Sequence, residues 1–162
     1  MIRYADIVSS SVVDGLGIRA VAYLQGCSIN CPGCHNPQLQ KHDGGSEVTE
    51  EEFAALLLSK LTPIHKGITF SGGEPTEQAE ALFKVISLLK AKQPNIDIWL
   101  FSGHTFEEIK HLPVLKLVDY LVDGPFLLQK RNLNLTFRGS ENQRIIDVQK
   151  SLVQKEIVEL KL

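Results

Sequence analysis

The sequence has no long apolar run, no strong excess of one charge and no cysteine outside one short segment. Its 162 residues carry a formal net charge of −2, and acidic and basic residues are interspersed, so no basic stripe is present that could follow a nucleic-acid backbone. No apolar run approaches the roughly 20 residues that cross a bilayer. Residues 1–8 lack the basic leader and apolar core of an export signal. We therefore expect a cytoplasmic protein that binds neither nucleic acid nor membrane.

Common catalytic signatures are also missing. There is no Gly-x-x-x-x-Gly-Lys phosphate loop and no Gly-x-Ser-x-Gly nucleophile turn. Four of the five histidines have no metal-ligand spacing among themselves and are expected on the surface or in turns: His42, His65, His104 and His111. With 43% hydrophobic residues, the chain is expected to bury one core as a single domain over residues 1–162.

The chain contains alternating strand and helix patterns. Short β-tolerant apolar runs predict strands at residues 18–25, 67–70, 96–101 and 117–122, with a possible fifth at 144–148. Helices are expected after capping boxes that begin at Thr49 and Thr105, and over an apolar period that runs from Leu82 to Leu89.

This alternation predicts an α/β fold with a mainly parallel sheet and right-handed crossovers, whose ligand site lies at the carboxyl ends of the strands. A complete eight-fold barrel needs about 250 residues. The chain is shorter, so we expect an incomplete (partial) βα-barrel.

All three cysteines, Cys27, Cys31 and Cys34, lie within eight residues, and His35 follows the last one. The Cys-x-x-Cys-His string is that of covalent haem attachment, but haem maturation requires export and the only methionine is the initiator. A zinc site is chemically acceptable, although ligands on one loop would join no distant segments. A redox dithiol at Cys31 and Cys34 leaves Cys27 without a role. Buried, unreactive cysteines are the simplest alternative, but a loop rich in Asn, Pro and Gly is a poor core segment.

An iron-sulfur cluster remains as the fifth interpretation. Four irons usually take four thiolates, and three cysteines leave one iron open for a substrate or cofactor.

The spacing Cys27-x3-Cys31-x2-Cys34, together with the Gly-Gly-Glu loop at residues 72–74, resembles the radical S-adenosylmethionine (SAM) superfamily. Within it, the chain is most similar to the activating proteins of anaerobic (class III) ribonucleoside-triphosphate reductases. The similar segments lie between about residue 4 and residue 148, at residues 14–19, 25–27, 31–37, 71–75, 122–126 and 138–144.

Two departures from the family pattern are visible. Leu16 stands where related activases commonly have proline, and the chain continues past residue 148 with a tail to which no function is assigned. Activating enzymes of pyruvate formate-lyase share the cysteine motif, but they are longer and usually have an aromatic residue at the position of Gly33. They are the nearest alternative.

The resemblance implies a [4Fe-4S] cluster held by Cys27, Cys31 and Cys34, with SAM at the open iron. A one-electron donor such as a flavodoxin would supply the electron that cleaves SAM, and the resulting radical would take a hydrogen from a glycine of the reductase. Further expected cofactor contacts are Gly33, Cys34, His35, Ser71, Gly72, Gly73, Glu74 and Ser102.

Several of these residues also have a simpler interpretation. Gly72 and Gly73 would let the backbone approach SAM closely, or would form an ordinary strand-to-helix turn. Glu74 would face the ammonium group of SAM, or would lie in the first helical turn. Asp123 and Arg138 would shape the mouth of the site, or would pair with each other as structural charges.

Two rival functions remain at this stage. A non-catalytic zinc-binding adaptor would contain one zinc and no iron. A radical SAM enzyme that acts on a small metabolite would cleave SAM without any reductase.

Overall fold

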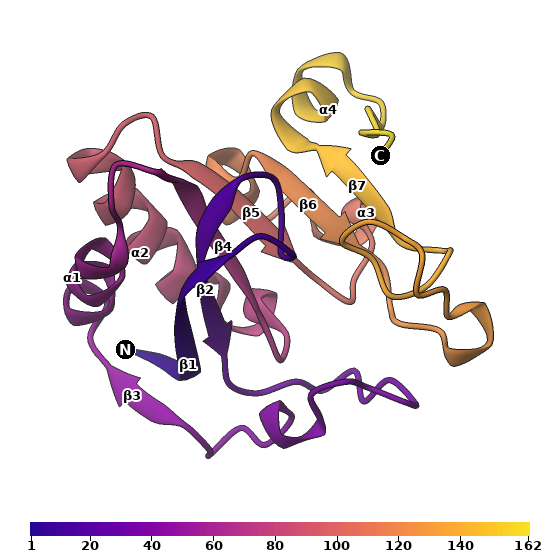
Figure 1. Cartoon of the computed structure of the whole chain (residues 1–162), viewed down its shortest axis with the longest axis horizontal. Helices are drawn as coiled ribbons and strands as arrows, with labels where there is room; N and C mark the ends of the chain where they lie inside the picture. The colour runs from indigo at the N-terminus through magenta and orange to yellow at the C-terminus, as the bar shows by residue number, and fades with distance from the viewer.

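A sheet of seven strands runs through the computed structural model, which describes residues 1–162 (Figure 1). In chain order the strands are β1 (Ile2–Ser11), β2 (Ile18–Leu24), β3 (Ser46–Val48), β4 (His65–Gly72), β5 (Asp97–Phe101), β6 (Tyr120–Asp123) and β7 (Arg144–Asp147). Their order across the sheet is β3-β1-β2-β4-β5-β6-β7. The four strands β2, β4, β5 and β6 pair in parallel, whereas β3, β1 and β7 join antiparallel.

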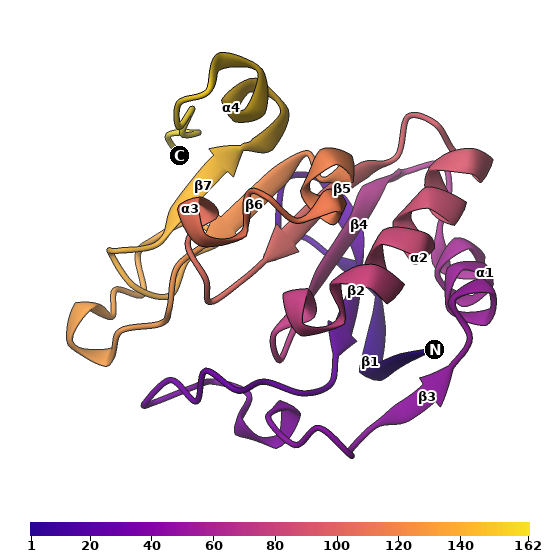
Figure 2. The same cartoon turned by 180° about the vertical axis from the view of Figure 1, so that it is seen from behind.

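The helical elements are short apart from two. They are α1 (Glu50–Lys60), α2 (Ala79–Lys92), α3 (Phe106–Ile109) and α4 (Val148–Gln154), with 3-10 turns η1 (Pro37–Leu39), η2 (Pro75–Gln78), η3 (Pro113–Leu117) and η4 (Leu128–Lys130). The expected capping boxes are confirmed at Thr49, which begins α1, and at Thr105, which begins α3. Figure 2 shows α1 and α2 side by side on one face of the sheet. A core of 24 buried residues fills the space between that face and the helices. No helix is both long enough and apolar enough to span a membrane.

The predicted fold class, an incomplete βα-barrel with a mainly parallel sheet, is wrong. The sheet is mixed, because three of its six strand pairings are antiparallel, and its outer strands β3 and β7 do not pair with each other. The predicted strands are present as β2, β4, β5, β6 and β7. The sequence patterns missed β1 and β3.

The reason for the error lies in the connections between strands. A parallel pair needs a crossover of a dozen or more residues, usually a helix, whereas an antiparallel pair needs only a turn or loop. Residues 12–17 are too short for a crossover, so β1 and β2 form a hairpin. Residues 124–143 contain only the three-residue turn η4 and no crossover helix, so β7 returns antiparallel to β6.

The parallel part of the sheet nevertheless positions four loops at one edge. The carboxyl ends of β2, β4, β5 and β6 lie together, and each continues into a loop. Figure 1 shows the cysteine-bearing loop after β2 and the long loop after β6 extending from this end of the sheet.

At the opposite end of the same strands, Arg19 is fully buried. All five of its N–H donors are used. They donate to Thr69 Oγ1 (2.8 Å), Leu16 O (2.9 Å), Asp97 Oδ2 (3.2 Å), Ile68 O (3.1 Å) and Asp97 O (2.8 Å). Burial lowers the pKa of Arg19, and the carboxylate of Asp97 partly offsets that effect. The guanidinium therefore joins β2, β4 and β5 on the face that α1 and α2 leave uncovered.

We expect Arg19→Met to lower the free energy of unfolding by about 3–5 kcal/mol, because it removes one partner of a buried ion pair and leaves Asp97 uncompensated. Chemical denaturation followed by circular dichroism measures this loss. Lys84→Met is the control: its ion pair with Glu51 is exposed and screened by water, so the loss should be much smaller. Equal losses in both variants would contradict the role of Arg19.

Candidate metal and cofactor site

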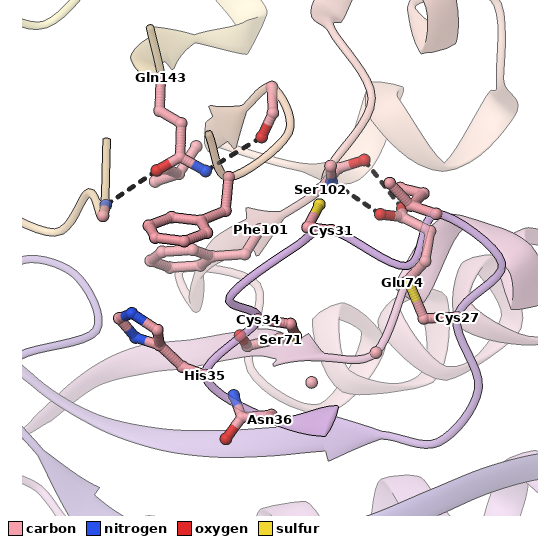
Figure 3. A pocket seen from close by; sticks show the side chains of 18 of the residues that line it. Cys27, Cys31, Cys34, His35, Asn36, Ser71, Glu74, Phe101, Ser102 and Gln143 are labelled. Carbon is pink, nitrogen blue, oxygen red and sulfur yellow. Dashed lines mark hydrogen bonds between the residues drawn. The ribbon is translucent and has the colours of Figure 1, made fainter. Parts of the chain in front are cut away.

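A cavity of about 220 Å³ opens at the carboxyl end of the parallel strands (Figure 3). It brings together loops that follow four different strands. Its lining residues are Cys27, Ile29, Cys31, Cys34, His35, Asn36, Gln40, Ser71, Gly72, Gly73, Glu74, Phe101, Ser102, Gly103, Val122, Gly124, Phe126, Phe137, Gly139 and Gln143. All three cysteines line this one space, each is half-buried and none forms a disulfide. In Figure 3, Ser71, Glu74 and Ser102 lie around them.

Two of the cysteines are the ends of a tight turn. The amide of Cys34 donates to the carbonyl of Cys31 (3.0 Å) across Pro32 and Gly33. Gly33 has φ +75°, and proline followed by a glycine with positive φ is the signature of a type II turn. The sequence Cys-Pro-Gly-Cys thus folds locally into a unit that presents two thiols from its ends.

The first cysteine is fixed at its backbone by the chain beyond the loop. Gly26 donates to Leu39 O (2.7 Å) and Cys27 donates to Gln40 O (3.1 Å). Burial raises the pKa of the Cys27 thiol above its usual value, and the carboxylates of Glu74 and Glu77 add to this effect. The thiol of Cys27 is therefore protonated at neutral pH until a metal replaces the proton.

The Gly-Gly pair after β4 packs against the chain's own backbone. A Cβ at Gly72 would lie 2.4 Å from Leu24 O, and one at Gly73 would lie 2.3 Å from Gly26 O. The amides are also engaged, since Gly73 donates to Leu24 O (2.9 Å) and Glu74 donates to Gly26 O (2.8 Å). Both glycines are thus needed for the close approach of the loop after β4 to the loop after β2.

Glu74 is buried, with 1% of its surface exposed. Its Oε1 accepts from the amide of Gly103 (2.7 Å), and its Oε2 accepts from the hydroxyl of Ser102 (2.8 Å). Oε2 also accepts from the amide and the hydroxyl of Thr76. Four protein donors therefore occupy this carboxylate, and it fixes the loop after β5 to the loop after β4.

The far wall of the cavity comes from the long loop between β6 and β7. Gln143 accepts from the amide of Gly139 (2.8 Å) and donates to Gly124 O (3.0 Å), which ties both ends of that loop together (Figure 3). Phe126 packs against His35 with ring centroids 5.1 Å apart. The cavity is therefore polar and thiol-lined on one side and aromatic on the other.

The structure brings together nearly all the site residues expected from the sequence. Of these residues, only Gly33 does not line the cavity; it faces Leu128 and Phe126 instead. Of the two alternatives left open for Asp123 and Arg138, the one in which they pair with each other is wrong. Asp123 is buried and paired with Arg144, whose Nη2 lies 2.6 Å from Oδ2, because β6 and β7 are neighbours and place the two residues opposite each other.

The sequence patterns missed the aromatic wall and its anchor. The residues that line the cavity without having been expected there include Phe101, Phe126, Phe137 and Gln143. Phe101 ends a predicted strand, and Gln143 lies in a segment that resembles the family, so the sequence held information that could have placed both residues at the site. Phe137 carried none: its φ of +60° and its edge-to-face contact with Trp99 (5.4 Å) depend on tertiary structure.

The donor chemistry of the site is that of sulfur. No group of three or more His, Cys, Asp or Glu side chains lies close enough to hold a single metal ion. A four-iron cluster has a different requirement, because each thiolate binds a different iron and the sulfurs surround the cluster without converging on one point. Three thiols around one cavity fit such a cluster in ligand type.

Comparison with known proteins gives a consistent result. Residues 13–146 match the family described as "4Fe-4S single cluster domain". The chain is 34% identical over 147 residues to the anaerobic ribonucleoside-triphosphate reductase-activating protein of Enterobacteria phage T4, a match that covers 88% of this chain and 92% of that protein. It is 32% identical over 149 residues to the protein of the same name from Vibrio cholerae, covering 88% and 96% of the two chains. The Salmonella typhi protein of that name is 31% identical, covering 87% and 96%.

We expect Gly73→Ala to lower the free energy of unfolding by roughly 1–3 kcal/mol, because the new methyl group meets backbone atoms of Gly26 that cannot move aside without the cysteine loop. Denaturant titration measures this. Gly103→Ala is the matched control, since its methyl group would meet only the flexible end of Ile29, and its loss should be smaller. A Gly73→Ala protein as stable as the Gly103→Ala protein would contradict this packing argument.

Proposed function

The chain belongs to the family of anaerobic ribonucleoside-triphosphate reductase-activating proteins, and from this premise we propose that it is a radical SAM activase that generates a glycyl radical on such a reductase. The cofactors of the proposal are a [4Fe-4S] cluster and S-adenosylmethionine. The observation that carries it is the cavity in which Cys27, Cys31 and Cys34 lie together with no fourth cysteine in the chain.

In this proposal the three thiolates hold the cluster, and no protein side chain takes the position of a fourth cysteine. The donor set supports this, since clusters of this type are held by cysteine thiolates. When bound, the cluster supplies the single electron that cleaves SAM, which is the source of the radical chemistry. The role of the protein is to bind, orient and shield these groups.

The polar side of the cavity is suited to the amino-acid part of SAM. Ser71 and Ser102 carry hydroxyl groups there, and Glu74 fixes the loop that presents Ser102. Because four protein donors already occupy the Glu74 carboxylate, we propose that it acts mainly through Ser102 and Gly103 rather than as a free partner for the ammonium group. Gly72 and Gly73 serve the same end by allowing the two loops to pack closely.

The aromatic side is suited to the nucleoside part of SAM and to the exclusion of water. Phe101, Phe126 and Phe137 line it, and His35 packs on Phe126. Apolar walls of this kind protect a reactive intermediate from solvent and from side reactions. In this proposal a backbone segment of the partner enters the cavity with a glycine at its tip.

The remaining parts of the proposal concern the setting of the reaction. We propose that residues 1–162 act as one domain, that the location is the cytoplasm, and that the electron comes from a one-electron donor such as a flavodoxin. The partner is the reductase named in the relatives. Activation of another glycyl radical enzyme, such as pyruvate formate-lyase, is the alternative that the shared cysteine motif keeps open.

The deciding experiment mixes anoxically prepared protein with SAM, a low-potential reductant and an anaerobic ribonucleoside-triphosphate reductase. A glycyl radical signal in electron paramagnetic resonance that needs all four components supports the proposal. Pyruvate formate-lyase in place of the reductase is the comparison arm. SAM cleavage without any radical on either enzyme would overturn the proposal, and so would protein that contains one zinc and no iron.

We expect Cys34→Ala to leave a folded protein that retains almost no cluster and yields no glycyl radical. The loop contributes nothing to the hydrophobic core, so the free energy of unfolding of the metal-free protein should change by less than roughly 1 kcal/mol. Iron and sulfide analysis after anoxic reconstitution measures retention. His111→Ala, at an exposed histidine outside the cavity, is the control and should retain iron fully. Full iron content in Cys34→Ala would remove Cys34 from the ligand set.

A further inference from the structure

A carboxylate outside the expected site holds the loop that carries the first cysteine. Glu77 lies in η2, just after the Gly-Gly-Glu loop, and 49 residues separate it from Ser28. The amide of Ser28 donates to Glu77 Oε2 (2.8 Å), and the hydroxyl of Ser28 donates to Oε1 (3.1 Å). Both oxygens of one side chain therefore bind the residue that directly follows Cys27.

His42, which follows the cysteine loop along the chain, contacts the same two residues. Its Nε2 lies 2.9 Å from Glu77 Oε1 and 3.3 Å from Ser28 Oγ. The imidazole also fills the space where a Cβ of Gly26 would lie, at 2.9 Å. His42 and Glu77 thus lie against Gly26 and Ser28, the two neighbours of Cys27, whereas Cys31 and Cys34 are organised by their own turn.

We propose that Glu77 is a positioning residue for the cluster: it fixes the backbone beside Cys27, and its negative charge keeps the reduction potential of the cluster low. This inference rests on one part of the proposed function, namely that a cluster is bound at the three cysteines. Nothing in the sequence motif marks this residue, which follows the recognisable Ser-Gly-Gly-Glu-Pro segment by two positions.

The electrostatic part of the proposal follows from where the Glu77 carboxylate lies. Both of its oxygens accept hydrogen bonds from Ser28, the residue directly after Cys27, so its charge lies beside the backbone that carries the first thiol. Glu77 is ionised at neutral pH: burial alone would raise its pKa, but hydrogen bonds from Ser28 and His42 outweigh burial and lower it. A negative charge this near disfavours an added electron on a cluster bound at Cys27.

The positioning part follows from burial and reach. The Glu77 side chain is 26% exposed, and it binds two polar groups of an exposed residue, the amide and the hydroxyl of Ser28. Groups just beyond the direct ligands commonly change metal affinity by 10–100-fold when they are mutated. Glu77 reaches a backbone amide, which replacement of the Ser28 side chain by alanine leaves in place, so replacement of Glu77 itself is the informative change.

The test uses the full-length protein reconstituted with iron and sulfide under anoxic conditions, and compares Glu77→Gln with the unchanged sequence. We expect a less negative midpoint potential in a redox titration followed by absorbance and electron paramagnetic resonance. We also expect iron loss to a chelator to become faster by on the order of tenfold. An unchanged potential together with an unchanged rate of iron loss would overturn the proposal.

Three further variants separate charge from geometry. Glu77→Asp keeps the charge but shortens the reach, so iron loss should become faster while the potential stays close to the original. Ser28→Ala removes only the hydroxyl contact and should have the smaller effect on both readouts. Glu51→Gln removes an exposed carboxylate on α1 that pairs with Lys84 on α2 and does not line the cavity, and it should change neither.

These variants also cover the case in which the Glu77→Gln protein does not fold. A thermal unfolding measurement shows whether it folds. Glu77→Asp then decides alone: iron retention equal to the original protein would overturn the positioning role, and a potential shifted to less negative values would overturn the charge role. Failure of the original protein to assemble any cluster would instead overturn the proposed function, and this inference with it.

Discussion

One buried carboxylate holds together the edge of the sheet on which the site is built. Glu74 accepts hydrogen bonds from Ser102 and Gly103 after β5 while it sits in the loop after β4. Parallel strands place their loops at one edge but do not fix the loops relative to one another. A fully satisfied buried carboxylate does so at low cost, because its charge is compensated by four donors in a poorly solvated space. This contact fixes the loop after β5 against the loop after β4, and both loops line the cavity.

The two ends of the parallel strands are specialised in different ways. At the amino end, Arg19 uses every donor to join three strands. At the carboxyl end, thiols, hydroxyls and aromatic rings face an open cavity. Trp99, in β5, lies between the two ends: the guanidinium carbon of Arg19 is 5.6 Å from the centre of its ring, and the ring centroid of Phe137 is 5.4 Å away. Trp99 therefore connects the packing around Arg19 with the aromatic wall of the cavity.

Local features of the site could be predicted from the sequence. The Cys-Pro-Gly-Cys turn follows from residue types alone, and the strands β2, β4, β5 and β6 follow from apolar runs bounded by turn signals. Contacts between distant segments could not. The sequence suggested that Gly72 and Gly73 make room for a ligand, whereas the structure fills that room with the backbone of Leu24 and Gly26.

The antiparallel strands could not be predicted from the sequence for a related reason. Alternation of strands and helices says little about a hairpin or a long loop without a helix, so β1, β3 and the direction of β7 were missed. Phe137 and Glu77 likewise belong to the site only through tertiary contacts. The periodicity of a sequence reports which face of an element is buried. It does not report which loops meet.

No residue between positions 25 and 38 belongs to the hydrophobic core, so the segment that carries the thiols is tied to the sheet by backbone contacts and not by buried apolar side chains. Those contacts are concentrated before the second cysteine, where the carbonyl of Gly26 accepts from the amide of Glu74. Side chains of the turn from Cys31 to Cys34 can therefore change with little penalty in folding. The scaffold is open to evolutionary change in ligand chemistry at that turn, and closed to it at the glycines on which the loop rests.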